Sequence, residues 1–298
     1  MMSAKPVNSY TAVLLVVFTG WFSALYAQVD LFPASYGIVG ESRGIYNPAL
    51  INTNAKYSAN LGNQFFPGTY NQLENHFLTA SINISGDSAK NRNNIGFKII
   101  TEKEGEYIFR PKIYISYAWH TGIYKDYHLG AGVNIGYAGY NYKATAVSAE
   151  GSAYGPDADV GIAVYNPLFT LGIALNQALN TVITPKLLPF RLKRFYSINI
   201  EKRFTIAQKN SIILNYQRQS VKSFHQNNCF GLHILMQRLL LVGIYYLPNE
   251  RLTFTLGIQD FTLEKHRFSV VFGYNTPLKI SAQSNIQSFE IMLAYKHL

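Results

Sequence analysis

The sequence of 298 residues contains a single cysteine, Cys229, and only 14% of its residues are charged. One cysteine cannot form an intrachain disulfide or a thiolate cluster for a metal, which excludes small disulfide-stapled scaffolds. The charged fraction is well below the roughly 25% of a typical soluble domain. After the N-terminus, no apolar run approaches the roughly 20 residues of a transmembrane helix. A polytopic helical membrane protein is therefore excluded.

Tyrosine and glycine are abundant, with 22 of each, and hydrophobic residues make up 48% of the chain. This composition argues against disorder and favours strands over helices. High apolar content with little charge suits a β-rich protein that faces lipid on one side. The formal net charge is +10, but the basic residues lie singly along the chain. We therefore expect no nucleic-acid partner.

The N-terminus has the pattern of an export signal. Lys5 precedes an apolar run over residues 12–18, and small and aromatic residues lead to Ala27. A positive start, a short apolar core and a small residue before a polar one predict a signal peptide over residues 1–27. The alternative is a retained N-terminal anchor helix.

Alternating polarity is the main indication of the fold. In residues 112–120, Ile113 and Ile115 fall on one face of a strand, and Tyr114 and Ser116 fall on the other. Similar alternation recurs in residues 56–65, 76–84, 94–102, 128–136, 158–165, 169–176, 194–201, 211–218, 227–236, 238–246, 251–260, 265–274 and 287–296. These segments predict an all-β fold, namely a transmembrane antiparallel β-barrel of about 14 strands. The even number agrees with bacterial outer-membrane barrels, which have even strand numbers.

The connections between these segments alternate in length. The longer ones cover residues 66–75, 103–111, 141–157, 177–193, 219–226, 247–250 and 275–286. The shorter ones cover residues 86–93, 121–126, 166–168, 202–210, 237 and 261–264. Outer-membrane barrels have short periplasmic turns and long extracellular loops. We therefore expect a signal peptide (1–27), an N-terminal periplasmic or lumen-plugging segment (28–55) and an outer-membrane β-barrel (56–298), with a secreted soluble β-protein as the alternative.

The sequence offers no convincing catalytic motif. Residues 40–44 match the G-x-S-x-G nucleophile elbow, but Pro48 follows too early for the helix that this motif needs. The histidines lack the paired spacing of a zinc site. Glu102, Glu104 and Glu106 are expected to form a solvated loop tip, with a calcium site as the weaker alternative. We expect no catalytic residues, no cofactor and no metal, and a protein that is not an enzyme.

Several short segments occur in a recognisable order. They are YNPAL at 46–50, NQ at 63–64, PDADVGI at 156–162, FTLGIAL at 169–175, RFYS at 194–197, FGYN at 272–275 and QSFEI at 287–291. This ordered set resembles the PorP/SprF family of type IX secretion system outer-membrane proteins. Asn275 and Phe289 depart from the family's usual Asp and His.

The resemblance implies a non-enzymatic, multi-pass barrel in the outer membrane of a diderm bacterium. Such a barrel would belong to the secretion and gliding machinery and would help to export or anchor a secreted surface protein. The implied partners are a secreted surface protein or adhesin C-terminal domain, other type IX secretion components and outer-membrane lipid.

A passive channel or a hydrophobic-substrate transporter of the fatty-acid type is the alternative function. A diffusion porin would carry a charged constriction, whereas the charged and histidine residues expected to face the lumen are few and of mixed sign. They are Lys98, Glu102, Lys112, His120, His128 and Asp159. The N-terminal segment, rich in proline and glycine, is able to plug the lumen in either case.

Exposed apolar and basic residues in the long loops are the candidate partner-binding residues, because exposed apolar patches mark contact surfaces. They are Phe66, Tyr154, Lys186, Leu187, Phe190, Arg191, Lys193 and Arg194. Two alternatives stay open: the apolar residues pack the loops together, and the basic residues contact lipopolysaccharide phosphates.

Overall fold

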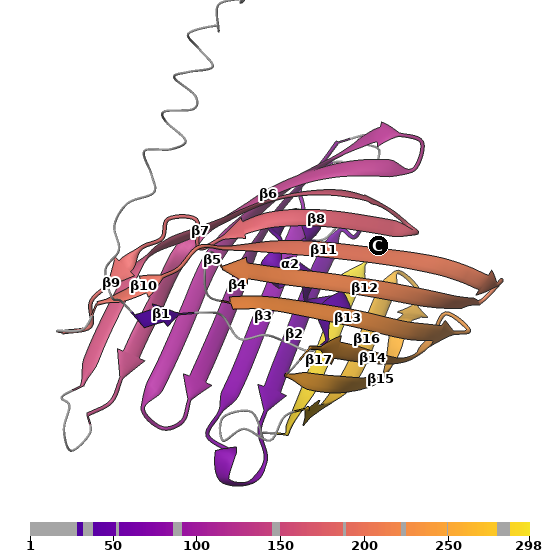
Figure 1. Ribbon diagram of the computed structural model, residues 1–298. Helices are drawn as coiled ribbons and strands as arrows, with labels where there is room; N and C mark the ends of the chain where they lie inside the picture. The colour runs from indigo at the N-terminus through magenta and orange to yellow at the C-terminus, as the bar shows by residue number, and fades with distance from the viewer. Residues whose placement is uncertain are drawn as a thin grey trace, which may run out of the picture.

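The computed structural model describes residues 29–31, 38–51, 54–85, 91–144, 150–186, 189–221, 225–248, 250–278 and 287–298. Fourteen antiparallel strands form one closed barrel, in which the last strand pairs with the first (Figure 1). These strands are β2 (Tyr57–Phe65), β3 (Glu74–Asn83), β4 (Asn91–Glu104), β5 (Ile108–Tyr124), β6 (Tyr127–Tyr142), β7 (Gly151–Asn166), β8 (Phe169–Asn176), β11 (Phe195–Ala207), β12 (Asn210–Val221), β13 (His225–Met236), β14 (Leu240–Leu247), β15 (Arg251–Leu263), β16 (His266–Pro277) and β17 (Ser288–His297). The predicted antiparallel barrel and all fourteen of its strands are confirmed.

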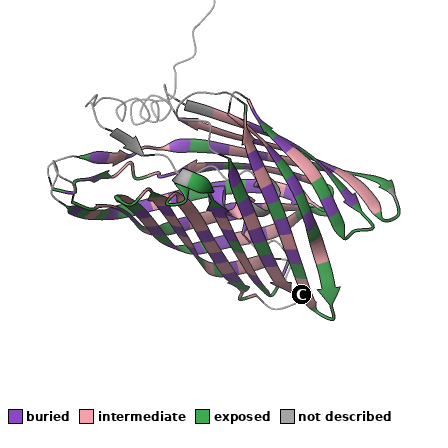
Figure 2. Ribbon diagram, turned by 90° about the horizontal axis from the view of Figure 1, so that it is seen from below, coloured by how far each residue is buried: buried purple, intermediate pink, exposed green. Residues whose placement is uncertain are grey.

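Burial alternates along the strands, as Figure 2 shows. On β5, Ile115 is 72% exposed on the outer surface, and its neighbour Ser116 is 2% exposed in the lumen. An apolar exterior suits lipid, and closure pairs the backbone groups that an open sheet edge would leave unsatisfied in a bilayer.

Several predicted connections are wrong because strands continue into them; residues 121–124 belong to β5, 202–207 to β11 and 261–263 to β15. Residues 103–111 and 141–157 belong largely to strands, because β4 and β5 are joined by residues 105–107, and β6 and β7 by residues 143–150. The segment 141–157 contains Gly155 and Pro156, two residue types that are depleted in strands. In the barrel they pair with Ala138 and Tyr137 on β6, so the neighbouring strand overrides the local preference.

The connections divide between the two ends of the barrel. We term one end the long-loop rim, where the connections are residues 66–73, 105–107, 143–150, 177–194, 222–224, 248–250 and 278–287. We term the other the short-turn end, where the connections are residues 84–90, 125–126, 167–168, 208–209, 237–239 and 264–265. The rim also carries the short 3₁₀ helix η2 (Gly68–Tyr70). The predicted signal peptide lies outside the described residues.

The described N-terminal residues cross the barrel from one end to the other. Strand β1 (Val29–Leu31) pairs in parallel with β10 (Phe190–Leu192), which pairs with β9 (Val182–Ile183) in the rim connection 177–194. Helix α2 (Val39–Tyr46) and the 3₁₀ helix η1 (Pro48–Leu50) then lie inside the barrel (Figure 1). At the short-turn end, the Lys56 amide donates a hydrogen bond to the His297 carbonyl at 2.7 Å.

Apolar side chains fill part of the interior. We term residues 38–51 the N-terminal part. Its residues Ile38, Ile45 and Tyr46 belong to one buried cluster with wall residues from both halves of the barrel. The wall members are Phe77, Ile100, Ile213, Cys229, Leu235, Leu241, Tyr245, Leu247, Val271 and Met292. No helix in the described residues has the length and apolar character needed to span a membrane.

Candidate functional site in the barrel lumen

A buried Asn-Pro-Ala turn forms the middle of the N-terminal part. The Asn47 side chain is fully buried, and its Oδ1 accepts a hydrogen bond from the Ala49 amide at 3.0 Å. Its Nδ2 donates to the Ile162 carbonyl on β7 at 3.2 Å. Pro48 occupies the start of η1, where its fixed φ suits a helix and its missing N–H costs nothing. Asn47 thus caps the turn and also attaches it to the wall.

Glycines on β6, β7 and β8 make room for this turn. A Cβ at Gly132 would lie 2.4 Å from the Pro48 carbonyl carbon. At Gly161 it would lie 2.1 Å from Asn47 Oδ1, and at Gly172 2.5 Å from Asn47 Nδ2. No side chain fits at such distances. Gly132, Gly161 and Gly172 therefore reflect close approach of the N-terminal part, whereas Gly136 on β6 lies against the Ile113 carbonyl of β5.

Lys98 and Asp159 form a buried ion pair beside the turn. Their Nζ and Oδ2 atoms are 2.6 Å apart, and both side chains are about 3% exposed. Lys98 Nζ also donates to the Ile45 carbonyl at 3.1 Å. Asn134 Nδ2 donates to Asp159 Oδ2 at 2.9 Å, and the Gln177 amide donates to Oδ1 at 3.1 Å. A buried pair needs such additional hydrogen bonds to offset its desolvation.

A second charged group lies closer to the rim. Glu102 is fully buried, and its carboxylate lies 3.3 Å from both Lys112 Nζ and Arg110 Nε. Arg110 also pairs with Glu104. The prediction of a solvated acidic loop tip is wrong for Glu102, because β4 continues through it and turns its side chain inward. In the described residues, no cluster of histidine, cysteine or acidic side chains is arranged to hold a metal.

A third polar group binds the start of the N-terminal part, at Ile38. Glu290 Oε2 accepts a hydrogen bond from the Ile38 amide at 3.0 Å. Its Oε1 accepts from Gln64 Nε2 at 3.2 Å and from Asn275 Nδ2 at 2.8 Å. Asn275 Nδ2 also donates to Ser288 Oγ at 2.8 Å. Strands β2, β16 and β17 therefore supply one connected network near the rim.

Two further contacts attach the N-terminal part to the barrel wall. Ser197 Oγ on β11 donates to the Tyr46 carbonyl at 2.9 Å, and Asn176 Nδ2 on β8 donates to Ser197 Oγ at 3.1 Å. Arg43 on α2 forms an ion pair with Glu201 at 3.1 Å. None of these wall residues was assigned to a site from the sequence. Their inward position, which follows from the alternation of side chains along each strand, was a usable signal.

The lumen-facing residues chosen from the sequence do face inward. Lys98, Glu102, Lys112, His120 and Asp159 are buried. The last of the set, His128, is half-buried and stacks on the Tyr165 ring at a centroid distance of 5.4 Å. The charged members meet as ion pairs of opposite sign rather than as a constriction of one sign.

The candidate partner-binding residues do not all lie on the rim surface. Phe190 is buried and stacks on Tyr140 at 4.1 Å, so the expectation that it is exposed is wrong. Tyr154 lies within strand β7 rather than in a loop, and it is 61% exposed on the outer face. Lys186 is exposed, and Arg194 Nε donates to the Ala178 carbonyl at 2.7 Å.

The other candidates lie around the same connections. Phe66, directly after β2, is half-buried. Arg191 lies in β10 and Lys193 follows it, both partly exposed. Leu187 lies outside the described residues. The rim connection 177–194 therefore presents its basic side chains around a small sheet that β1 helps to build.

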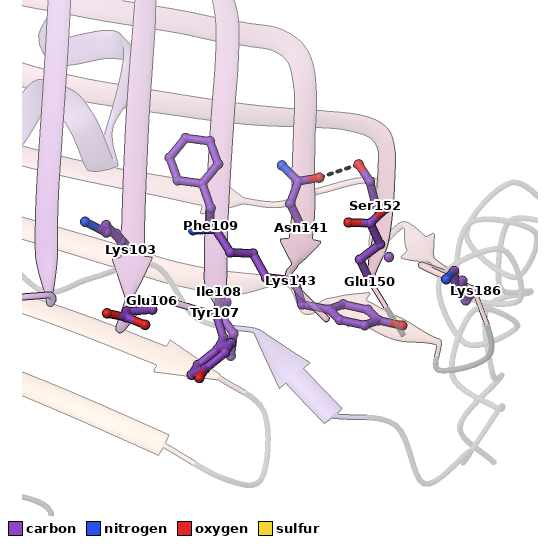
Figure 3. A pocket seen from close by; sticks show the side chains of 12 residues that line it. Lys103, Glu106, Tyr107, Ile108, Phe109, Asn141, Lys143, Glu150, Ser152 and Lys186 are labelled. Atoms are coloured by element: carbon purple, nitrogen blue, oxygen red, sulfur yellow. Dashed lines mark hydrogen bonds between the residues drawn. The ribbon is translucent and has the colours of Figure 1, made fainter. Parts of the chain in front are cut away.

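A pocket of about 820 Å³ opens at the rim, between the tips of the β4–β5 and β6–β7 hairpins (Figure 3). Lys103, Lys143 and Lys186 line it together with Glu106 and Glu150. Its aromatic walls come from Tyr107, Phe109 and Tyr142. A second cavity, of about 400 Å³, lies below α2 and η1 toward the short-turn end.

A family model described as type IX secretion system membrane protein PorP/SprF matches residues 41–295. The chain belongs to the PorP/SprF family. This membership and the closed barrel together make it an outer-membrane β-barrel of the type IX secretion system. A comparison with the curated proteins finds no match.

Solved structures similar to this PorP/SprF barrel are outer-membrane barrels. The Ralstonia pickettii toluene transporter TbuX has 10% sequence identity and a TM-score of 0.55, over 90% of this chain and 96% of that chain. The Pseudomonas putida toluene transporter TodX has 9% identity and a TM-score of 0.54, over 90% and 98%. A Pseudomonas aeruginosa FadL homologue has 10% identity and a TM-score of 0.52, over 90% and 95%. At such identities the likeness shows the fold alone.

The segments that carry the PorP/SprF resemblance meet around the N-terminal part of the barrel. Asn47 of the first segment contacts Gly161 of PDADVGI and Gly172 of FTLGIAL. Other segments contribute Ser197, which binds the Tyr46 carbonyl, and the network of Gln64, Asn275 and Glu290. These ordered segments thus share one structural task, which is to hold residues 38–51 in the lumen.

Proposed function

We propose that this barrel, whose lumen is blocked by residues 38–51, is a non-enzymatic component of the type IX secretion system that binds a secreted surface protein at its long-loop rim. Membership of the PorP/SprF family supports a task in secretion. The observation that carries the proposal is the attachment of residues 38–51 across the lumen by Lys98, Ser197 and Glu290. A barrel filled in this way is suited to binding at its rim rather than to free passage of solutes.

The rim has the chemistry of a contact surface. Several apolar side chains there are at least 41% exposed. They are Tyr70, Tyr107, Leu179, Val182 and Leu278. Exposed apolar groups beside charged ones are typical of protein-binding surfaces. Basic residues around connection 177–194 would orient a partner with an acidic surface.

Capture from native envelopes tests this function. The intact barrel, tagged at its C-terminus and expressed in its own host, should retain a secreted surface protein or another secretion component after gentle detergent extraction. The matched control is a variant whose rim connection 66–73 is replaced by a short glycine-serine turn. If both forms retain the same proteins, or neither retains any, rim binding is contradicted.

A second candidate function is transport of small hydrophobic molecules. It is favoured by the fold shared with TbuX and TodX, which are described as toluene transporters, and by the apolar cluster inside the barrel. Uptake of toluene into liposomes that contain the purified barrel distinguishes the two candidates. Binding at the rim predicts uptake no faster than in empty liposomes, whereas transport predicts a clear acceleration.

A further inference from the structure

The contacts of residues 38–51 are those of a bound peptide. Wall groups bind its main chain at several points. Glu290 accepts from the Ile38 amide at 3.0 Å, Lys98 donates to the Ile45 carbonyl at 3.1 Å, and Ser197 donates to the Tyr46 carbonyl at 2.9 Å. Such contacts recognise a polypeptide through its backbone N–H and C=O groups, which do not depend on the side chain. Asn47 adds a side-chain contact to the wall.

Each of these wall groups is also held by another wall residue. Glu290 accepts hydrogen bonds from Gln64 and Asn275, and Asn176 donates to Ser197. Lys98 is paired with Asp159, which accepts a further hydrogen bond from Asn134. The wall groups are therefore positioned without the N-terminal part. Pre-organisation of this kind distinguishes a binding site from a core that collapses when one element leaves.

The shape of the wall supports the same conclusion. Gly132, Gly161 and Gly172 leave a hollow that Asn47 and Pro48 fill, and any larger residue there would overlap them. The cavity of about 400 Å³ continues the hollow toward the short-turn end, where Leu50 and Ile51 line it. The hollow and the polar groups face the same stretch of chain.

We infer that the barrel lumen is a peptide-binding site, and that residues 38–51 of this chain are its resident ligand. The ligand class is a polypeptide segment that presents a short helix followed by an Asn-Pro-Ala turn. The segment binds by hydrogen bonds and shape, so it remains bound after its covalent link to β2 is cut, and a free copy exchanges with it.

The test uses the full chain. A protease site inserted after Asn54, an exposed residue before β2, lets the folded barrel be cut after purification. The cut barrel is then incubated with a fluorescent synthetic peptide of residues 28–54. We expect the cut segment to stay bound through gel filtration, and the labelled peptide to replace it at a saturable ratio of one peptide per barrel.

Two wall variants, each with a matched control, show where the peptide binds. Gly161→Ala places a methyl group against Asn47 and should weaken peptide binding about tenfold or more. Its control, Gly122→Ala, changes another inward glycine whose Cβ would meet only His128, at 3.9 Å. Ser197→Ala should weaken binding about fivefold. Its control, Thr255→Val, removes a buried hydroxyl on β15 that has no hydrogen-bond partner among the described residues.

Heat-modifiable migration in gels reports separately whether the cut barrel remains folded. If cutting destroys that behaviour, residues 38–51 are part of the barrel core and the inference is overturned. It is also overturned if the segment leaves and the labelled peptide does not bind, or if all four variants bind the peptide equally. None of these outcomes depends on whether a surface protein binds at the rim.

Discussion

The amide of Ile38 donates a hydrogen bond to the carboxylate of Glu290 at 3.0 Å, across 252 positions of sequence. One partner comes directly before the lumenal helix and the other lies in the last strand of the barrel. Closure of the barrel through β17 and β2 places Gln64 against the same carboxylate. The position of the N-terminal part therefore depends on completion of the barrel.

Replacing Glu290 should destabilise the barrel. Glu290→Ala removes the acceptor of the buried Ile38 amide. It also removes one of two acceptors of Gln64 and of Asn275, which keep only Ser288 Oγ. We expect a loss of about 2 kcal/mol in the free energy of unfolding, measured by urea titration of the detergent-solubilised barrel. Glu264→Ala, on an exposed turn, is the control and should change little. Equal losses in both variants would contradict the role given to Glu290.

The Lys98–Asp159 pair should behave as one unit. Lys98→Met or Asp159→Asn alone leaves a buried charge without its partner, and each should cost about 3–5 kcal/mol of unfolding free energy. The double variant removes both charges and should cost less than the sum of the two single changes. A urea-unfolding double-mutant cycle measures this difference. Strict additivity would show that the two side chains do not stabilise each other.

The strands could be predicted from the sequence because apolar and polar residues alternate along each strand with a period of two. Ile115 and Ser116 show this, and the burial of Lys98 and Asp159 follows from the same rule. The pairing of Ile38 with Glu290 could not be predicted, because it depends on closure between the first and last strands. The burial of Phe190 was missed for a similar reason, since Tyr140, which covers it, comes from a different strand.

Strand β1 should be accessible from the side of the long loops. Strand β1 pairs with β10 at the long-loop rim, whereas β2 begins at the other end of the barrel. A short epitope tag placed directly before Val29 should therefore be labelled by antibody on intact cells, as should a tag in the rim connection 143–150. A tag in the turn 264–265 should be labelled only after the outer membrane is permeabilised. Labelling of the Val29 tag only after permeabilisation would contradict this path of the chain.

Charge reversal at the rim should affect partner binding but not barrel assembly. Changing Lys186, Arg191 and Lys193 to Glu removes the positive field around β10, and Arg194 is left intact because it holds the Ala178 carbonyl. Partner retention should fall severalfold at low salt, with a smaller effect at high salt, because salt screens exposed charges. Retention is measured by quantitative mass spectrometry of captured envelopes.

The control for this experiment reverses three exposed lysines at the short-turn end, Lys125, Lys209 and Lys265. Their reversal should leave retention unchanged. If the rim variant retains its partner fully but becomes detergent-sensitive or assembles poorly, its basic residues contact lipid phosphates instead.

Single-channel recording in planar bilayers tests most directly whether residues 38–51 close the lumen. The intact barrel should show no steady open level across the voltage range that it tolerates. A variant that lacks residues 29–51 should show a steady open level, since Lys98, Ser197 and Glu290 would then face water. A steady open pore in the intact barrel, with the same conductance after deletion, would contradict the account of a closed barrel that acts through its rim.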